Sequence, residues 1–288
     1  MKLPDGRTLG FDDVGAADGA ALLYVHGTPD SRRSRHPDDG LATDAAVRLV
    51  AVDRPGSGLS TPHPSGSVAT FADDMAVLAR HLGIDRWSVL AWSAGAPFGL
   101  AVAARHPHLV SRVTVAAGLP PVDAYGRPGL LDGASGDRLT VAELGAELGP
   151  QTAAEMLAPM LAPVPCDHAL AVEHVLESPD PVRRAELDAV PGAIDAMADG
   201  IVDAVAWGLD ALVHEIEVQL RPLDVDLADV TCPVDLRYGS ADPSAPQAFG
   251  RWYADTLPNA TLEVLDGAGH CFVLPHWADA LRLAVRTA

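Results

Sequence analysis

Three polar residues that lie far apart in the chain have the types needed for nucleophilic catalysis: Ser93, Asp242 and His270. A serine hydroxyl is a weak nucleophile at neutral pH and needs a neighbouring base, for which an imidazole is well suited. A carboxylate can orient that imidazole and stabilise its charged form. We therefore expect His270 to accept the proton of Ser93, and Asp242 to orient His270.

Strands must bring these three residues together. Segments 88–92, 230–238 and 261–265 are largely apolar or β-branched without a helical period, and each ends shortly before one of the three residues. A helix over 94–106 is expected directly after the first segment. Because parallel strands of an open α/β sheet present their carboxyl ends at one edge, the three side chains are expected to meet there.

The turn at Ser93 has room only for small neighbours. Ala91 lies two residues before the serine and Gly95 two residues after it, and almost no loop separates the strand from the helix. Such a turn strains the backbone and pushes the serine oxygen out at the end of the sheet. The stretch resembles the nucleophile elbow, Gly-x-Ser-x-Gly, of the α/β-hydrolase fold family, with Ala91 in place of the first glycine.

A second stretch, His26-Gly27-Thr28-Pro29, follows a buried strand predicted over 20–25 and resembles the His-Gly-x-Pro loop of the same family. The resemblance implies an oxyanion hole formed by the backbone N–H groups of Thr28 and Ala94. The glycine lets the backbone bend away from the sheet, and the proline stiffens the loop. We predict that His26 braces this loop, and we assign His26 and Trp92 to the substrate-binding side of the site.

A third stretch, Asp53 to Ser60, follows a strand predicted over 47–52 and resembles the family's Asp-x-x-Gly-x-Gly-x-Ser segment. The third glycine and the helix of a dinucleotide fingerprint are missing, so we expect a rigid turn beside the active site and no nicotinamide site. The cysteines, Cys166, Cys232 and Cys271, are too widely spaced for a zinc pattern. The sequence therefore predicts neither a cofactor nor a metal.

Strands and helices alternate through the first 119 residues. After a hairpin in 1–14, strands are predicted over 20–25, 47–52, 88–92 and 110–117, and helices over 70–82 and 94–106. Three strand–helix repeats favour a parallel sheet with right-handed crossovers. The predicted fold class is α/β, namely an α/β-hydrolase fold with a mostly parallel, doubly wound sheet and an inserted helical cap.

The character of the chain changes between residues 120 and 222, where no convincing strand is found. Helices are predicted there over 141–148, 152–161, 168–176 and 194–220. The expected domains are a core formed by 1–119 and 223–288 and a carboxylate-rich insertion over 120–222. The insertion resembles the cap that excludes water and shapes the pocket in many family members. A separate helical domain with no role at the site is the alternative.

The charge of the chain narrows the choice of partners. Its 288 residues include 39 Asp+Glu and 20 Lys+Arg, which gives a formal net charge of −19. Such a charge repels phosphates, so nucleic acid is not expected as a partner. No apolar run is long enough for a membrane span, and the first residues lack the apolar region of a signal peptide. We expect a cytoplasmic protein with free thiols and a small-molecule substrate, and a homo-oligomer is left open.

These observations predict a serine hydrolase that cleaves a small ester or a related acyl compound through an acyl-enzyme. Asp123 is a rival for the role of Asp242, because some family members carry the acid soon after the preceding strand. A serine at position 93 excludes the family's dehalogenases and epoxide hydrolases, which need an aspartate nucleophile.

Three alternatives remain open at this point. The first is an aminopeptidase of the proline-iminopeptidase kind, which the His-Gly-Thr-Pro loop and the acidic insertion favour, although Asp30 departs from that family's wider pattern. The second is a C–C bond hydrolase or a lactonase. The third is a small-molecule receptor that keeps the same fold and the same residues without turnover.

Overall fold

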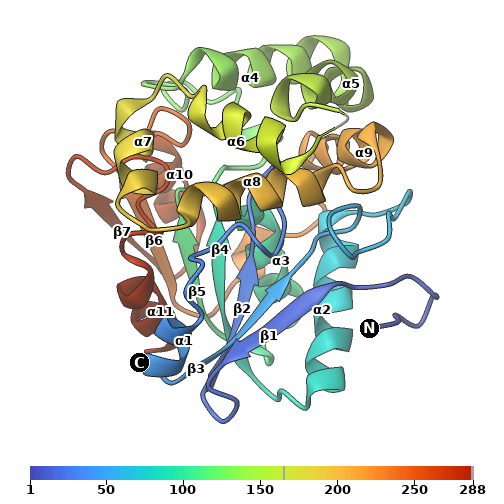
Figure 1. The fold of residues 1–288 in the computed structure, drawn as a ribbon, viewed down its shortest axis with the longest axis vertical. Helices are drawn as coiled ribbons and strands as arrows, with labels where there is room; N and C mark the ends of the chain where they lie inside the picture. The colour runs from blue at the N-terminus through green and yellow to red at the C-terminus, as the bar shows by residue number, and fades with distance from the viewer. Residues whose placement is uncertain (165, 287–288) are drawn as a thin grey trace.

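Seven strands form one sheet, in the order β1-β3-β2-β4-β5-β6-β7 (Figure 1). The computed structural model describes residues 1–164 and 166–286. Among the described strands, β1 runs antiparallel to β3 and every other neighbouring pair is parallel. The sheet is therefore the mostly parallel one that the strand–helix alternation predicts. The strands are β1 (Phe11–Gly15), β2 (Ala20–Val25), β3 (Val47–Val52), β4 (Trp87–Trp92), β5 (Val110–Ala116), β6 (Val234–Gly239) and β7 (Ala260–Leu265).

Helices cover both faces of the sheet, which explains why its middle strands are almost entirely buried. All six residues of β4 are buried. Helix α11 (Trp277–Val285) packs against β2, β4 and β5, and next to it α1 (Gly40–Asp44) packs against β1 and β3. Helix α3 (Ala96–Arg105) contacts the same strands and packs against α2 (Val68–Leu82), while α10 (Gln247–Thr256) lies on β6 and β7.

In the described part of the chain, six further helices lie between β5 and β6 in the sequence and above the carboxyl ends of the strands in space (Figure 1). We call them the inserted helices. They are α4 (Gly136–Leu148), α5 (Pro150–Leu161), α6 (His168–Leu176), α7 (Pro181–Asp188), α8 (Ala193–Ala204) and α9 (Leu209–Gln219). The predicted boundaries of the insertion, 120 and 222, fall in the connections that flank this group.

The single helix predicted over 194–220 is wrong. The chain forms α8 and α9 instead, and Gly208, with φ +86°, lies at the start of α9. A glycine in that conformation ends a helix readily, and the apolar periodicity on either side conceals the break. The N-terminal hairpin is also reduced, because residues 1–10 contribute only the isolated bridge between Lys2 and Thr8.

Helix α7 was absent from the sequence prediction, although its start carries clear signals. Pro181 occupies its first turn, and the side chain of Asp180 accepts the backbone N–H groups of Val182 and Arg183. A capping aspartate followed by proline is typical of a helix N-terminus.

None of the described helices has both the length and the apolar composition that crossing a membrane requires.

Candidate active site

Ser93, His270 and Asp242 lie in one hydrogen-bonded row. The Ser93 Oγ atom is 3.0 Å from His270 Nε2, and His270 Nδ1 is 2.8 Å from Asp242 Oδ2. Each residue follows a different strand, Ser93 after β4, Asp242 after β6 and His270 after β7. These strands end at the same edge of the sheet, so the parallel topology brings together residues up to 177 positions apart.

The turn at Ser93 is tight and strained. Ser93 has φ +54°, a left-handed conformation that is costly for a residue with a side chain. A Cβ at Gly95 would lie 2.5 Å from the carbonyl oxygen of Val25, so only glycine fits there. Ala91 replaces the first glycine of the elbow pattern. A Cβ at Gly99 would lie only 2.7 Å from the Ala91 Cβ. Gly99 thus provides the space that Ala91 takes up.

The Asp242 carboxylate is buried and fully engaged. Its Oδ1 accepts the backbone N–H groups of Ser244 (2.8 Å) and Ala245 (3.0 Å), while Oδ2 faces His270. Burial raises the pKa of this carboxyl, but the His270 charge and these hydrogen bonds outweigh it, so that the pKa lies below its usual value. The aspartate therefore stays ionised and can stabilise an imidazolium.

The loop that carries His270 is held from two sides. Glu186 of α7 accepts the backbone N–H groups of Gly269 (2.6 Å) and Cys271 (2.8 Å). On the other side, the indole N–H of Trp92 donates to the carbonyl oxygen of His270 at 3.1 Å. Contacts on the residues before, at and after the histidine fix the direction of its ring.

The two backbone N–H groups expected to form an oxyanion hole, those of Thr28 and Ala94, border the same cavity as Ser93. Within the described residues, neither N–H group donates to a protein acceptor. Ala94 lies in the first turn after β4, where helix N–H groups lack intrahelical partners. Gly27 allows the close approach of the loop, because a Cβ there would lie 3.1 Å from the Ser93 Cβ.

A buried ion pair connects the Thr28 loop to the inserted helices. The Arg54 guanidinium lies 2.6 Å from Glu215 Oε1 of α9 and donates to the carbonyl oxygen of Gly27. The Thr28 hydroxyl donates to the same Glu215 oxygen and accepts a hydrogen bond from Gln219. Burial raises the pKa of Glu215 and lowers that of Arg54, while each partner's charge opposes the shift in the other.

His26 and Trp92 do not line the cavity, contrary to their assignment to the substrate-binding side. His26 is fully buried, its Nε2 accepts the backbone N–H of Arg54, and Nδ1 lies 2.8 Å from the carbonyl oxygen of Gly27. It therefore braces two loops, and burial holds its pKa well below the usual value. Trp92 is 2% exposed and contacts the His270 loop. Both side chains are thus buried and hydrogen-bond to neighbouring loops instead of facing the cavity.

The rival acid, Asp123, does not reach the imidazole. It is exposed in the short turn Val122–Ala124, whereas Asp242 is the carboxylate within hydrogen-bonding distance of His270. The arrangement of Ser93, His270 and Asp242 is the one needed for nucleophilic attack with general-base assistance.

A cavity of about 420 Å³ separates the sheet from the inserted helices and opens onto Ser93 and His270. Thr28, Ala94 and Pro29 line its floor, and residues of α4, α5, α7 and α9 contribute to its walls. The volume is suited to a small organic molecule. The lining includes apolar side chains such as Leu119, Val141, Leu157, Ile216 and Leu220 together with a few charged ones.

Sequence reasoning missed the residues that support the site from a distance. Arg54 belongs to a stretch that was predicted only as a rigid turn, and Glu186 and Glu215 were counted among the many carboxylates of the insertion. Nothing in the local pattern distinguishes Glu186, a partly buried glutamate of α7, from an exposed one. A weak signal existed for Glu215, which falls between the apolar residues of α9 rather than on its polar face.

A family model described as the alpha/beta hydrolase fold matches residues 20–276. A proline iminopeptidase of Xanthomonas citri is 37% identical over 112 residues, which cover 36% of this chain and 34% of that protein. The chain thus spans only about a third of the length of the first curated relatives it matches. A pimeloyl-[acyl-carrier protein] methyl ester esterase of Chromobacterium violaceum is 28% identical over 245 residues, 84% of this chain and 83% of that protein.

Solved structures show the same architecture. An esterase from Rhodococcus sp. ECU1013 superposes with a TM-score of 0.69, covering 99% of this chain and 96% of that one, at 20% sequence identity. At this identity the likeness concerns the fold, and it agrees with the sheet order described above.

Proposed function

The chain belongs to the α/β-hydrolase fold family and is a hydrolase, and on that premise we propose that it cleaves a small ester or related acyl compound through an acyl-enzyme on Ser93. The observation that carries the proposal is the row of hydrogen bonds from Asp242 through His270 to Ser93. The row ends at a cavity that both Ser93 and His270 line.

In the first half of the proposed reaction, Ser93 Oγ attacks the carbonyl carbon while His270 Nε2 takes its proton. The negative oxygen that forms accepts hydrogen bonds from the N–H groups of Thr28 and Ala94. Asp242 keeps the imidazolium oriented through Nδ1–H. His270 then gives its proton to the departing alcohol, which leaves the acyl group on Ser93.

In the second half, a water molecule attacks the acyl carbon and His270 again takes the proton. Collapse of the second tetrahedral intermediate returns the proton to Ser93 and releases the carboxylic acid. The inserted helices act as a cap in this proposal, because they limit the access of bulk water to the cavity and so strengthen the electrostatic interactions inside it.

An aminopeptidase of the proline-iminopeptidase kind is the second candidate. The identity to such enzymes and the presence of Glu177 in the cavity wall favour it, since a carboxylate could bind a substrate amine. A C–C bond hydrolase or a lactonase would use the same three residues. We place the protein in the cytoplasm in this proposal, because its cysteines form no disulfide within the described residues.

The proposal is tested by offering an acyl 4-nitrophenyl ester and a prolyl 4-nitroanilide to the same preparation and labelling it with a fluorophosphonate. We expect ester hydrolysis and labelling at Ser93.

Ser93→Ala should lower kcat by about 10⁴-fold or more, while its unfolding transition stays at the wild-type position. Anilide hydrolysis would favour the peptidase. An unlabelled Ser93, with tight binding of a ligand that is recovered unchanged, would show a receptor instead.

A further inference from the structure

We propose that the substrate of this site carries a carboxylate, which is held by the guanidinium groups of Arg138 and Arg183 in the cavity above Ser93. The inference rests on the proposed hydrolase function and adds the chemical class of the substrate. It would make the site selective for half-esters of dicarboxylic acids, or for similar anionic acyl compounds.

The charge of the cavity wall runs against the charge of the molecule. The whole chain has 39 acidic and 20 basic side chains. Along the cavity, basic side chains outnumber acidic ones, because the lining includes two arginines, Arg138 and Arg183, and one glutamate, Glu177. Glu177 is exposed to solvent, where water and salt screen its charge. The wall therefore offers positive charge in a protein that otherwise repels anions.

Arg138 is anchored on the loop of the proposed catalytic acid. It lies in the first turns of α4, is partly buried, and donates through Nε to the carbonyl oxygen of Ser244 at 3.2 Å. Ser244 in turn donates its backbone N–H to Asp242. The anchor uses Nε alone, and no described carboxylate lies within ion-pair distance of the Arg138 guanidinium. Among the side chains that the structure describes, none accepts a hydrogen bond from its terminal nitrogens, which lie at the cavity wall.

Arg183 comes from the helix that rests on the His270 loop. A Cβ at Gly269 would lie 2.9 Å from Val182 Cγ1 and 3.0 Å from Glu186 Oε2, which shows how closely α7 packs there. Burial raises the pKa of the Cys271 thiol to about 12 and the Arg183 charge opposes that shift, so the guanidinium lies near the catalytic loop. Its Nη1 donates a long hydrogen bond of 3.5 Å to the carbonyl oxygen of Val175.

Three of the carboxylates near the site are engaged by groups other than these two arginines. Asp242 faces His270, Glu186 accepts two backbone N–H groups, and Glu215 pairs with Arg54. Burial raises the pKa of a fourth, Asp30, to about 6, and the Arg183 charge is among those that oppose this shift. By contrast, Arg184, the neighbour of Arg183, pairs with Asp188 at the surface. A partly desolvated guanidinium without an anionic partner favours binding of a carboxylate, whose two oxygens match its planar fork of donors.

The test compares two esters that differ at one end. The 4-nitrophenyl half-ester of adipic acid and 4-nitrophenyl hexanoate share the leaving group and the chain length, with a carboxylate in place of a methyl group. We expect the wild-type kcat/KM to favour the half-ester by about tenfold or more, the size expected for one charge-assisted contact. Arg138→Gln and Arg183→Gln should each reduce this preference several-fold, and the double variant should abolish it.

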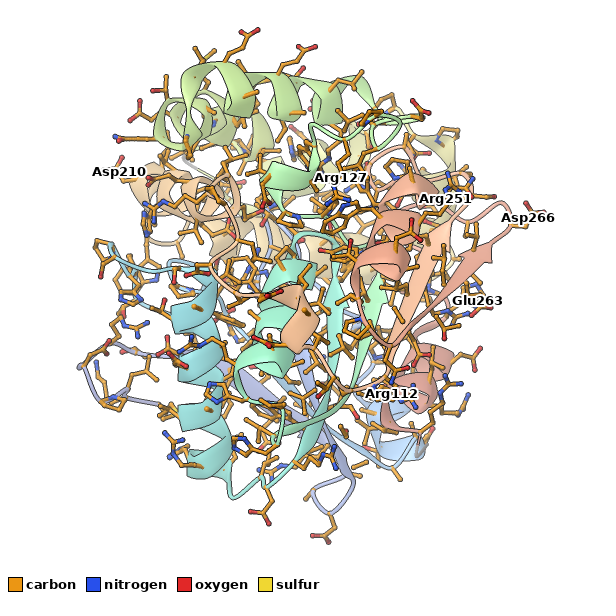
Figure 2. All side chains as sticks on the ribbon, turned by 180° about the vertical axis from the view of Figure 1, so that it is seen from behind. Arg112, Arg127, Asp210, Arg251, Glu263 and Asp266 are labelled. Atoms are coloured by element: carbon orange, nitrogen blue, oxygen red, sulfur yellow. The ribbon has the colours of Figure 1, made fainter. Side chains whose placement is uncertain are left out.

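Two controls separate charge recognition from general damage. Arg138→Lys and Arg183→Lys keep the charge and should retain part of the preference. Arg251→Gln changes an exposed arginine of α10 that contacts Gln247 and is labelled in Figure 2, and it should leave the preference as it is. The unfolding transition of every variant is measured alongside.

A binding measurement keeps this inference distinct from the proposed function. Ser93→Ala should bind monomethyl adipate more tightly than methyl hexanoate, and the difference should shrink as NaCl is added. If the wild type hydrolyses both esters equally well, the carboxylate site is wrong and the hydrolase proposal stands. If neither ester is hydrolysed and Ser93 stays unlabelled, the proposed function fails. In that case the Ser93→Ala binding data still test the carboxylate site: tighter binding of monomethyl adipate supports it, and equal binding of the two esters contradicts it.

Discussion

At the scale of single residues, the hydrogen-bond partners of each polar side chain determine whether it takes part in the site or supports the fold. Asp242 has both oxygens engaged, so it orients the imidazole and remains charged. His26, which the sequence analysis placed on the substrate-binding side, uses its two ring nitrogens inside the core. Burial and hydrogen-bond partners, rather than residue type, separate the two cases.

We expect Asp242→Asn to lower kcat by about 10³- to 10⁴-fold and to leave a measurable residual rate. An amide still fits the space, but it favours the wrong tautomer of His270 and cannot stabilise the imidazolium. The measurement is the hydrolysis of a 4-nitrophenyl ester. Asp123→Asn is the matched control, because Asp123 is exposed and lies away from the imidazole. A larger loss with Asp123→Asn would reassign the acid.

Asp30, next to the Thr28 loop, makes the stability of the protein depend on pH. Burial raises the pKa of its carboxyl to about 6, compared with 3.8 for an exposed aspartate. Between these values the folded chain keeps a proton that the unfolded chain releases. The contribution of Asp30 to stability therefore falls as the pH rises from about 4 to about 6, and it stays low at higher pH.

Asp30→Asn removes this dependence. Relative to the wild type, the free energy of unfolding of the variant should rise by about 2–3 kcal/mol between pH 4 and pH 7. Urea unfolding at several pH values measures it, with Asp266→Asn, an exposed position labelled in Figure 2, as the control for the same substitution. A difference that stays constant across this range would contradict the assignment.

At the scale of elements, the inserted helices do more than cover the sheet. Helix α7 holds the His270 loop through Glu186, and helix α9 holds the Thr28 loop through Glu215 and Gln219. The base and one half of the proposed oxyanion hole are thus both oriented by helices from the insertion. A shift of these helices would change the geometry of the reaction as well as the shape of the cavity.

Breaking the link between α9 and the core should be costly. Glu215→Gln leaves the Arg54 charge buried without its partner, which should lower the free energy of unfolding by about 3–5 kcal/mol. Glu217→Gln on the same helix removes a partly exposed pair with Arg221 and should cost less than about 1 kcal/mol. Urea unfolding of both variants gives the comparison. Equal losses of unfolding free energy in the two variants would mean that the buried pair contributes no more to stability than the exposed one.

At the scale of the whole molecule, the net charge of −19 acts on the folded state as self-repulsion. Acidic side chains reach solvent on opposite sides of the molecule, as Asp210, Glu263 and Asp266 illustrate in Figure 2. The cavity wall, with its two arginines, is a local exception to this field.

Salt should therefore stabilise the protein. Raising NaCl from about 10 mM to about 0.3 M shortens the screening length from roughly 30 Å to well under 10 Å and weakens the repulsion between distant carboxylates. We expect Tm to rise by about 2–4 °C, which corresponds to about 1 kcal/mol for a chain of this size. Differential scanning calorimetry measures it. A Tm that falls with salt would mean that attractive ion pairs outweigh the repulsion.

The sequence by itself determined most of the strands, their mostly parallel arrangement and the residue types at the strand ends, whereas the order of the strands in the sheet comes from the structure. The strands at β2 and β3 could be predicted to the residue, because a buried parallel strand is a continuous apolar run. Ser93, Asp242 and His270 could be selected because each follows such a run, and the fold class follows from the same alternation. The break between α8 and α9 could not, since apolar periodicity continues across it.

Only the tertiary structure decided which polar residues act together. Glu215 and Thr28 are 187 positions apart, and Glu186 and Cys271 are 85 apart, so no local pattern connects them. The same holds for the two arginines in the cavity wall, which come from separate helices. Periodicity reports the surroundings of a residue along its own element, whereas a side chain's charge, burial and partners depend on the elements that fold against it.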